Sequence, residues 1–244
     1  MKTVILLTGC INPDGMKFTS LNDTEERGRQ YIQAVRYYLT STNYPVIFCE
    51  NSGTDISTHF LEPISTNRLE CITYQGNQEK TRGKGYGECD IIEYAIKHSQ
   101  FIHSQANLRI AKITGRLIVQ NIRTILSLHQ AFSTKHTTFC MINSDLSFPD
   151  SRLILAHIDF YKAFLSYKEK IDDANGYFFE HALCDMIKSN RTFPFSPFFI
   201  CPQVIGISGS SGKAYITEPS SISFKLKYAR YAASQLYRFN KQYR

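Results

Sequence analysis

The amino-acid sequence predicts a single α/β domain built on a mostly parallel central sheet with helices on both faces. Short apolar segments alternate with longer segments of helical periodicity through the first 142 residues. The chain has 244 residues, of which 43% are hydrophobic, and this is enough to bury a sizeable core. No linker, internal repeat or low-complexity tract divides it.

The first part of the chain supplies most of the expected sheet. Strands are expected at residues 2–8, 45–50, 69–74, 108–113 and 137–142. Asn22 followed by Glu25 resembles a capping pair that opens the first helix. The apolar face of that helix contains Ile32, Val35 and Leu39. Because strands and helices alternate, ligands are expected at the carboxyl ends of the strands.

Two further helices are expected between these strands. One covers residues 90–98, and the other covers residues 117–132. The inward positions of the first are Ile91, Ile92, Ala95 and Ile96. Those of the second are Ile118, Ile122, Ile125 and Leu128 with His129.

The chain beyond residue 150 has a less regular pattern. It predicts a strand at 152–157, helices near 159–170 and 177–189, a Pro/Phe-rich stretch at 193–202 and a final helix. The segment "GISGSSGKA" at 206–214 is not a P-loop, because five residues separate Gly206 from Gly212 and Ala214 replaces the required Ser or Thr. This segment is either a lid over the active site or a surface turn.

The charge and the cysteine content indicate which kinds of ligand and which cellular compartment to expect. The net charge of +7 predicts an anionic ligand, which could be nucleic acid, nucleotide phosphate or a membrane surface. No apolar run approaches the roughly 18 residues of a membrane-spanning helix. Only Val4 to Leu7 of "MKTVILLTGC" could form a signal-peptide core, so a buried first strand is expected. Seven cysteines without a CxxC pair predict reduced thiols of a cytoplasmic protein.

Polar residues follow three of the predicted strands at the point where each strand ends. They are Thr8, Gly9 and Asn12 after the first strand, Glu50 and Asn51 after the second, and Gln75, Gly76 and Asn77 after the third. Carbonyl, amide and carboxylate groups suit the base and ribose hydroxyls of a nucleoside. The alternative is that these residues only make turns.

The segment "TRGKGYGECD" at 81–90 places Gly83, Lys84, Gly85 and Gly87 just before a predicted helix. Glycines let the backbone approach a ligand, and a helix amino terminus with a nearby lysine favours a diphosphate. The alternative is a solvated loop.

A second cationic segment, "RIAKITGRLIVQN" at 109–121, carries Lys112 and Arg116 on either side of Thr114 and Gly115. Thr114 is expected to cap the helix at 117–132, with the two cations beside its amino terminus. This predicts a further place for phosphate or sugar hydroxyls. Arg116 could instead pair with a structural carboxylate.

Two acidic regions are candidates for acid–base chemistry. Asp145 and Asp150 follow the strand at 137–142, and Glu180 with His181 lies in the first turns of an aromatic-rich helix. A carboxylate beside aromatic side chains would have a raised pKa and could act as a base. The alternative role of Glu180 is to complement the helix dipole.

Four segments together resemble small bacterial glycosyltransferases of capsule and O-antigen synthesis. They are Glu50 to Asp55, Gly83 to Glu88, Lys112 to Arg116 and the triplet Phe179-Glu180-His181. The resemblance covers residues 2–215 and implies a GT-A-like fold that holds a nucleotide-sugar. It also implies that Glu180 is the base of the "ED" motif, with His181 in place of the Asp.

The same resemblance implies a glycosyltransferase domain at 1–220, with a nucleotide-binding half at 1–145 and an acceptor-side half at 146–220. A basic amphipathic helix is expected to follow at 221–244. Many such enzymes hold Mn²⁺ or Mg²⁺ with an Asp-x-Asp motif, whereas this chain has only Asn143-Ser144-Asp145. Either Asp145 binds the ion together with water, or Lys84, Lys112 and Arg116 neutralise the diphosphate without metal. We favour the second.

The predicted function is therefore transfer of a hexosyl unit from a nucleotide-sugar to a glycan acceptor, which we expect to be lipid-linked. Two alternatives belong to other classes. A sugar-phosphate nucleotidyltransferase would need more glycine and arginine after its first strand than Gly9 and Gly15 provide. A basic nucleic-acid-binding protein would use the 15 tyrosines and 17 phenylalanines, but these stand mostly at core-like spacings. No nucleic-acid partner is expected.

The tail predicts a membrane contact. No acidic residue occurs from Phe224 to Arg244, and the basic residues there are Lys225, Lys227, Arg230, Arg238, Lys241 and Arg244. One apolar stripe of the expected helix contains Tyr228, Tyr231, Ala232, Leu236, Phe239 and Tyr243. The pattern predicts a helix lying in the anionic inner face of a membrane. The alternative is a terminal helix whose stripe packs on the domain.

Overall fold

The central sheet organises the chain in the computed structural model, which describes residues 1–15, 21–76, 78–209, 212–215 and 221–243. Within these residues a seven-stranded sheet has the order β3-β2-β1-β4-β7-β6-β8. Its strands are β1 (Lys2–Gly9), β2 (Val46–Glu50), β3 (Leu69–Thr73), β4 (Leu108–Thr114), β6 (Thr138–Ile142), β7 (Pro149–His157) and β8 (Phe195–Ser196). Two short strands, β5 (Ile118–Val119) and β9 (Val204–Ile205), pair separately.

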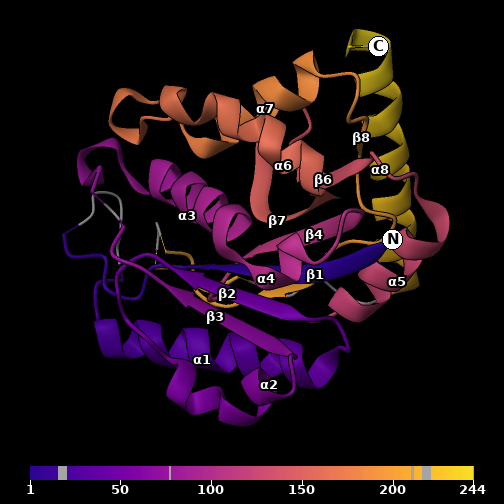
Figure 1. Cartoon of the computed structure of the whole chain (residues 1–244). Coiled ribbons are helices and arrows are strands. Elements are labelled where there is room, and N and C mark those ends of the chain that lie inside the picture. The colour runs from indigo at the N-terminus through magenta and orange to yellow at the C-terminus, as the bar shows by residue number, and fades with distance from the viewer. Residues whose placement is uncertain (16–20, 77, 210–211, 216–220, 244) are drawn as a thin grey trace.

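Helices cover both faces of this sheet (Figure 1). They are α1 (Thr24–Ser41), α2 (Leu61–Ser65), α3 (Lys84–His98), α4 (Gln100–His103), α5 (Ile122–Phe132), α6 (Ile158–Phe164), α7 (Phe179–Ser189) and α8 (Ile222–Tyr243). Short 3₁₀ helices are η1 (Ser57–Phe60), η2 (Lys80–Arg82), η3 (Leu165–Lys170) and η4 (Asp173–Asn175). In Figure 1, α3, α6 and α7 lie above the sheet, and α1 and α2 lie below it. The predicted α/β class with helices on both faces is confirmed.

The parallel strands bring several strand ends to one edge. β1 pairs in parallel with β2 and β4, and β2 pairs in parallel with β3. β7 runs antiparallel to both β4 and β6, so the sheet is mixed but mostly parallel. Gly9 pairs with Glu50, and Thr8 pairs with Thr114. The carboxyl ends of β1, β2 and β4 therefore lie side by side.

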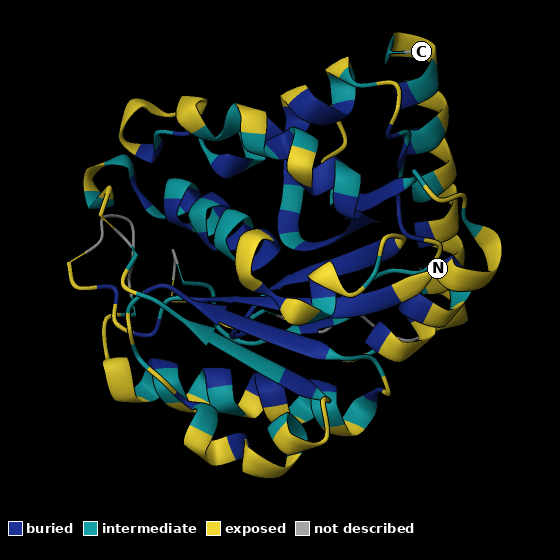
Figure 2. Cartoon of the chain, in the orientation of Figure 1, coloured by how far each residue is buried: buried dark blue, intermediate teal, exposed yellow. Residues whose placement is uncertain are grey.

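Alternating side chains of β1 enter two separate cores. Val4 and Leu6 pack with α3, α6 and α7, whereas Ile5 and Leu7 pack with α1 and α5. Successive side chains of a strand point to opposite faces, so a strand buried on both sides is mostly apolar. The central strands are accordingly mostly buried (Figure 2).

Three predicted helix starts are wrong. The first helix is capped by Asp23, which accepts hydrogen bonds from Glu25 and Glu26, and not by Asn22. The helix expected at 117 begins at Ile122, because Ile118 pairs with Ile205 in a strand. Thr114 therefore ends β4 and caps no helix. The helix expected at residue 90 begins at Lys84, so the glycine-rich segment forms its first turns.

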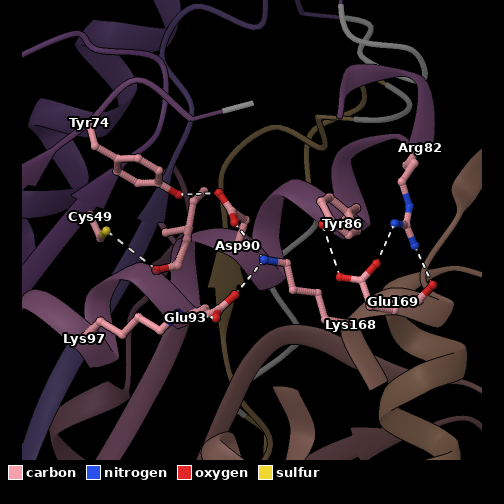
Figure 3. Close-up of polar contacts among 10 residues, drawn as sticks. Cys49, Tyr74, Arg82, Tyr86, Asp90, Glu93, Lys97, Lys168 and Glu169 are labelled. Carbon is pink, nitrogen blue, oxygen red and sulfur yellow. Dashed lines mark hydrogen bonds and ion pairs between the residues drawn. The ribbon is translucent and has the colours of Figure 1, made fainter. Parts of the chain in front are cut away.

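Polar contacts tie α3 to the chain that precedes α7. Lys168 Nζ lies 2.8 Å from Asp90 Oδ1 and 2.6 Å from Glu93 Oε2, both on α3 (Figure 3). Near the start of α3, Arg82 Nη1 lies 2.9 Å from Glu169 Oε2. These contacts hold α3 in a defined position relative to the second part of the chain.

The terminal helix α8 packs on the edge of the sheet near β8 (Figure 1). Tyr228 and Phe239 are buried, and the Phe239 ring lies 4.7 Å from the Phe195 ring. The Tyr228 hydroxyl donates a hydrogen bond of 2.8 Å to the Phe198 carbonyl. The prediction that this stripe enters a membrane is therefore wrong, because it contributes to the protein core. No described helix is long and apolar enough to cross a bilayer.

Candidate active site

A cavity of about 540 Å³ opens where the carboxyl ends of β1, β2 and β4 meet. Residues of α1, α3, β6, β7, α7 and α8 also line it, together with Ile207, Ser208 and Gly209. The predicted site residues that line it are Thr8, Gly9, Asn51, Lys84, Thr114, Arg116 and Glu180. The segment at 206–214 thus contributes to the cavity, although residues 210–211 lie outside the described residues.

Asn51 lines this cavity, and its amide group is buried without a hydrogen-bond partner among the described residues. Its side chain is 1% exposed, and neither the oxygen nor the nitrogen of the amide has a hydrogen-bond partner among the described residues. Its backbone is held by Gly9, whose carbonyl accepts from the Asn51 N–H at 3.1 Å. A buried donor or acceptor without a partner costs about 1–3 kcal/mol. The arrangement suits a ligand that offers one donor and one acceptor.

Glu50, the neighbour of Asn51, has a structural role. Its carboxylate accepts hydrogen bonds from the backbone N–H groups of Ile11 at 2.8 Å, Ser52 at 2.9 Å and Thr54 at 3.0 Å. Asn12 is exposed and donates its own N–H to the Ser52 hydroxyl. Neither Glu50 nor Asn12 lines the cavity, so the predicted nucleoside contacts of these two residues are not found.

Lys112 lies buried beneath the cavity floor and not at a helix terminus as predicted. Its ammonium group forms an ion pair with Glu88 and donates a hydrogen bond of 2.7 Å to the Ser151 carbonyl. It also lies 5.3 Å from the centre of the Phe179 ring. A buried cation needs such partners, because leaving it unpaired would cost several kcal/mol. Lys112 is therefore not available to a diphosphate.

Glu88 is a cavity residue that the sequence patterns did not single out. Its carboxylate accepts hydrogen bonds from Thr8 at 3.2 Å and Thr114 at 3.5 Å, besides the contact with Lys112. Its side chain is 21% exposed and lines the cavity. The sequence signal that could have identified Glu88 was its position at the end of the glycine-rich segment Gly83 to Glu88. This segment forms the first turns of α3, which lie beside the strand ends.

Glu180 lies at the start of α7 and faces the same cavity. Burial raises the pKa of its carboxyl group, while a hydrogen bond of 2.6 Å from the Ser151 hydroxyl acts in the opposite direction. The nearby Glu88 raises this pKa further, and Lys112 lowers it. A carboxylate with a raised pKa is suited to accept a proton near neutral pH.

His181 does not line the cavity. Its Nδ1 atom accepts a hydrogen bond of 3.1 Å from the Phe178 N–H and so caps the amino terminus of α7. The ring also packs against the rings of Phe148 and Phe178. The predicted substrate contact of His181 is therefore replaced by a role in positioning the helix that carries Glu180.

Arg116 supplies positive charge to the cavity. It is 7% exposed, and its Nη1 atom donates to Gln30 Oε1 at 2.9 Å and to the Ile207 carbonyl at 3.4 Å. No carboxylate lies within ion-pair distance of Arg116 in the described part of the chain. Lys84 lines the cavity as well. The alternative pairing of Arg116 with a structural carboxylate is thus not found among the described residues, and the charge of Arg116 suits an anionic ligand.

The glycines that precede and open α3 serve packing. Asp173 accepts a hydrogen bond of 3.0 Å from the Gly85 N–H, so a carboxylate already occupies this helix terminus. A Cβ atom on Gly83 or on Gly85 would lie only 2.6 Å from Asp173. Similarly, a Cβ on Gly115 would lie 2.6 Å from the Thr8 carbonyl. The Asp173 carboxylate therefore occupies the Gly85 N–H that was predicted to meet a diphosphate, whereas Lys84 of the same segment lines the cavity.

Asp145 lies outside the cavity lining. It is exposed in the turn after β6, where it accepts hydrogen bonds from the Ser147 N–H at 2.9 Å and the Ser147 hydroxyl at 2.5 Å. These bonds lower the pKa of its carboxyl group. This placement does not support the predicted catalytic or metal-binding role of Asp145.

Two of the acidic residues that line the cavity are paired with cations of the protein. Glu88 is paired with Lys112, and Asp150 is paired with Arg152 through contacts of 2.9 Å. No group of three or more potential ligands from His, Cys, Asp and Glu is found among the described residues. We assign no chemical step to a metal ion.

No protein-family model and no curated protein matches the chain. Among solved structures, it is similar to a protein described as a nucleotide-diphospho-sugar transferase from Desulfovibrio desulfuricans G20. That match has 12% identity and a TM-score of 0.45, over 81% of this chain and 80% of the other.

Two other solved structures are similar to the chain. A cytidylyltransferase from Leptospira borgpetersenii serovar Hardjo-bovis matches with 12% identity and a TM-score of 0.43, over 99% of this chain and 94% of the other. Core-mannan synthase A from Aspergillus fumigatus, in its Mn/GDP form, matches with 10% identity and a TM-score of 0.41, over 90% of this chain and 80% of the other. These similarities concern the fold, so we infer function from the cavity itself.

Proposed function

We propose that the protein is a glycosyltransferase that moves a hexosyl unit from a nucleotide-sugar to a hydroxyl group of a glycan acceptor. One observation carries the proposal. Glu180, whose pKa is raised by burial, lines the same cavity as Arg116, a cation without a carboxylate partner among the described residues. Displacement of a diphosphate by a hydroxyl group needs both a base and a cation at one place.

In the proposed reaction, the Glu180 carboxylate accepts the proton of the acceptor hydroxyl. The acceptor oxygen then forms a bond to the anomeric carbon of the donor sugar. The bond from that carbon to the diphosphate oxygen breaks, and its electron pair leaves with the nucleoside diphosphate. Arg116 and Lys84 stabilise the negative charge of this leaving group. The Asn51 amide binds the nucleobase, which supplies the partners that it lacks.

The residues that we assign to the donor and to the acceptor come from different segments of the chain. Asn51 and Arg116, which we assign to the donor, belong to residues 1–145, whereas Glu180 belongs to residues 146–220. We propose these two segments as the donor-side and acceptor-side halves. From the sequence resemblance we further propose a lipid-linked acceptor in capsule or O-antigen synthesis, at the cytoplasmic face of a membrane.

The proposal is tested with a panel of UDP-, GDP-, CMP- and dTDP-sugars, each with and without Mn²⁺. We expect one donor class to raise the melting temperature, because a ligand that binds only the folded state stabilises it. Mass spectrometry of the same mixtures with glycan acceptors should then detect sugar transfer. Stabilisation and product formation from a nucleoside triphosphate and a sugar phosphate would instead favour a nucleotidyltransferase. Binding of single-stranded RNA alone would favour the nucleic-acid-binding alternative.

The role of Glu180 is tested by Glu180→Gln. This variant should bind the donor as the unaltered protein does and lose about 10²–10⁴-fold in turnover, which is the usual contribution of a general base. Glu62→Gln is a matched control, because Glu62 also lies in the first turn of a helix but is exposed and outside the cavity. Undiminished turnover in Glu180→Gln would exclude Glu180 as the base.

A further inference from the structure

The outer face of α8 carries apolar side chains that the domain does not cover. Ile222 is 77% exposed, Leu226 is 58% exposed and Tyr237 is 68% exposed. With 3.6 residues per turn, these residues and the exposed Ala233 fall within about 60° of one another around the helix. They form a ridge on the side opposite Tyr228 and Phe239, which pack on the domain. We call the residues Ile222, Leu226, Ala233 and Tyr237 the outer ridge.

Cations stand on both sides of the outer ridge. Lys225 lies on one flank, while Lys227, Arg230 and Lys241 lie on the other, and all four are exposed. The segment from Phe224 to Arg244 contains no acidic residue. In the described part of the chain no carboxylate lies within ion-pair distance of these four cations. Their charges are therefore exposed to solvent on the outer side of the helix.

We propose that the outer ridge and its flanking cations bind the surface of an anionic lipid bilayer. The boundary between head groups and acyl chains accepts aliphatic and aromatic side chains, while lysine and arginine beside them contact lipid phosphates. A nucleic-acid backbone would match the charges but would leave Ile222 and Leu226 without an apolar environment. The helix lies along the bilayer and does not span it. This proposal does not depend on the cavity or on the reaction proposed for it.

Membrane binding through this face would place the cavity close to lipid-linked molecules. Tyr231, on the inner side of α8, lines the cavity and donates a hydrogen bond of 2.7 Å to the Ile142 carbonyl. One side of the helix thus contacts the bilayer while another forms part of the cavity wall. The bilayer surface and the cavity wall are therefore separated by about one helix diameter, or 10–12 Å.

The proposal is tested by co-sedimentation of the full chain with vesicles of phosphatidylcholine, with and without phosphatidylglycerol. We expect binding only when the anionic lipid is present, and release at high salt. The triple variant Lys225→Gln, Lys227→Gln, Arg230→Gln should bind about a hundredfold more weakly, since each basic residue contributes roughly fivefold near anionic lipid. The matched control replaces three exposed cations outside α8, Lys135, Lys162 and Arg191, with glutamine.

The apolar part of the surface is tested by Leu226→Ser, which removes a largely exposed side chain and should leave the melting temperature unchanged. We expect about a tenfold loss of vesicle binding, because a leucine side chain leaves the interface. Binding that is equal for neutral and anionic vesicles, or absent for both, would overturn the proposal. An equal loss of vesicle binding in the control triple variant would also overturn it. The same holds if the protein does not bind vesicles but binds single-stranded RNA through α8.

Discussion

Ser151 connects Glu180 to Lys112, because its hydroxyl donates to Glu180 Oε1 at 2.6 Å while its carbonyl accepts from Lys112 Nζ at 2.7 Å. Lys112 also forms an ion pair with Glu88, so Glu88 and Glu180, two of the three carboxylates that line the cavity, are linked through Ser151 and one buried cation. The proposed base is thus held by a network that begins in the middle of β4. Four predictions follow from this network and from the cations and amides around it.

Replacement of Ser151 by alanine should change the pH dependence of catalysis. The Ser151 hydrogen bond lowers the pKa of Glu180, so its loss raises that pKa further. In the proposed reaction Glu180 acts in its charged form, so activity should be lost as the pH falls through its pKa. The acidic limb of the kcat profile should therefore move to higher pH in Ser151→Ala, with KM for the donor unchanged. At pH 7 we expect roughly a tenfold lower kcat, since a mispositioned catalytic group commonly costs that much or more.

The control is Ser147→Ala, which removes a hydroxyl that also bonds to a carboxylate, but in an exposed turn outside the cavity. Its pH profile should match that of the unaltered protein. An acidic limb that stays in place in Ser151→Ala, despite normal folding, would contradict the assignment of Ser151 as the residue that positions Glu180.

Replacement of Lys112 by methionine should lower the free energy of unfolding by about 3 kcal/mol. The change leaves Glu88 without its cation, and breaking a buried pair by removing one partner is strongly destabilising. The double variant Lys112→Met, Glu88→Gln should recover part of this loss, because no unpaired charge remains. Urea denaturation of the four proteins of this cycle measures the coupling. Stabilities that add without coupling would show that the two side chains do not depend on each other.

Replacement of Asn51 by leucine should have opposite effects on stability and on binding. It removes a buried amide with two unpartnered atoms, so the free energy of unfolding of the unliganded protein should rise by about 1 kcal/mol. It also removes the proposed contact with the nucleobase, so donor affinity should fall about tenfold. Thermal unfolding and calorimetry measure the two effects. A loss of stability together with unchanged affinity would contradict the role assigned to the amide.

Replacement of Arg116 by alanine should weaken the binding of nucleoside diphosphates about 10- to 100-fold, because a charge-assisted hydrogen bond to phosphate is lost. The affinity for the corresponding nucleoside should change little, since the nucleoside carries no diphosphate. Arg191→Ala is the control, because Arg191 is exposed and outside the cavity. Equal losses for nucleoside and nucleoside diphosphate would place Arg116 at the base and not at the phosphates.

The positions of the central strands follow from local pattern. The apolar runs at 2–8, 45–50 and 108–113 correspond to β1, β2 and β4, which are buried on both faces and are therefore mostly apolar. The run at 69–74 corresponds to β3, a partly buried strand at the edge of the sheet. Their parallel arrangement brings the polar residues after them to one edge. For this reason the sequence could locate the candidate cavity without knowing its shape.

The sequence could not decide which polar side chain faces the cavity. Glu50 and Asn51 are neighbours, yet the first binds loop backbone and the second lines the cavity. Successive residues at the end of a strand point in different directions, and both are chemically able to bind a nucleoside. The role of each depends on the loops that fold around it.

Contacts between segments that are distant in the sequence explain the remaining differences between the predictions and the structure. Asp173 occupies the amino terminus of α3, Glu88 pairs with Lys112, and Ile205 draws Ile118 into a strand where helical periodicity predicted a helix.

On α8 the sequence determined an amphipathic, basic helix, and the tertiary structure decided that Tyr228 and Phe239 pack on the domain while Leu226 faces outward. The same physical reason explains why the structure differs from the predictions in α8 and in the other segments. Periodicity and composition report what a segment can bury or bind, whereas the partner that it meets comes from elsewhere in the chain and is known only once the chain has folded.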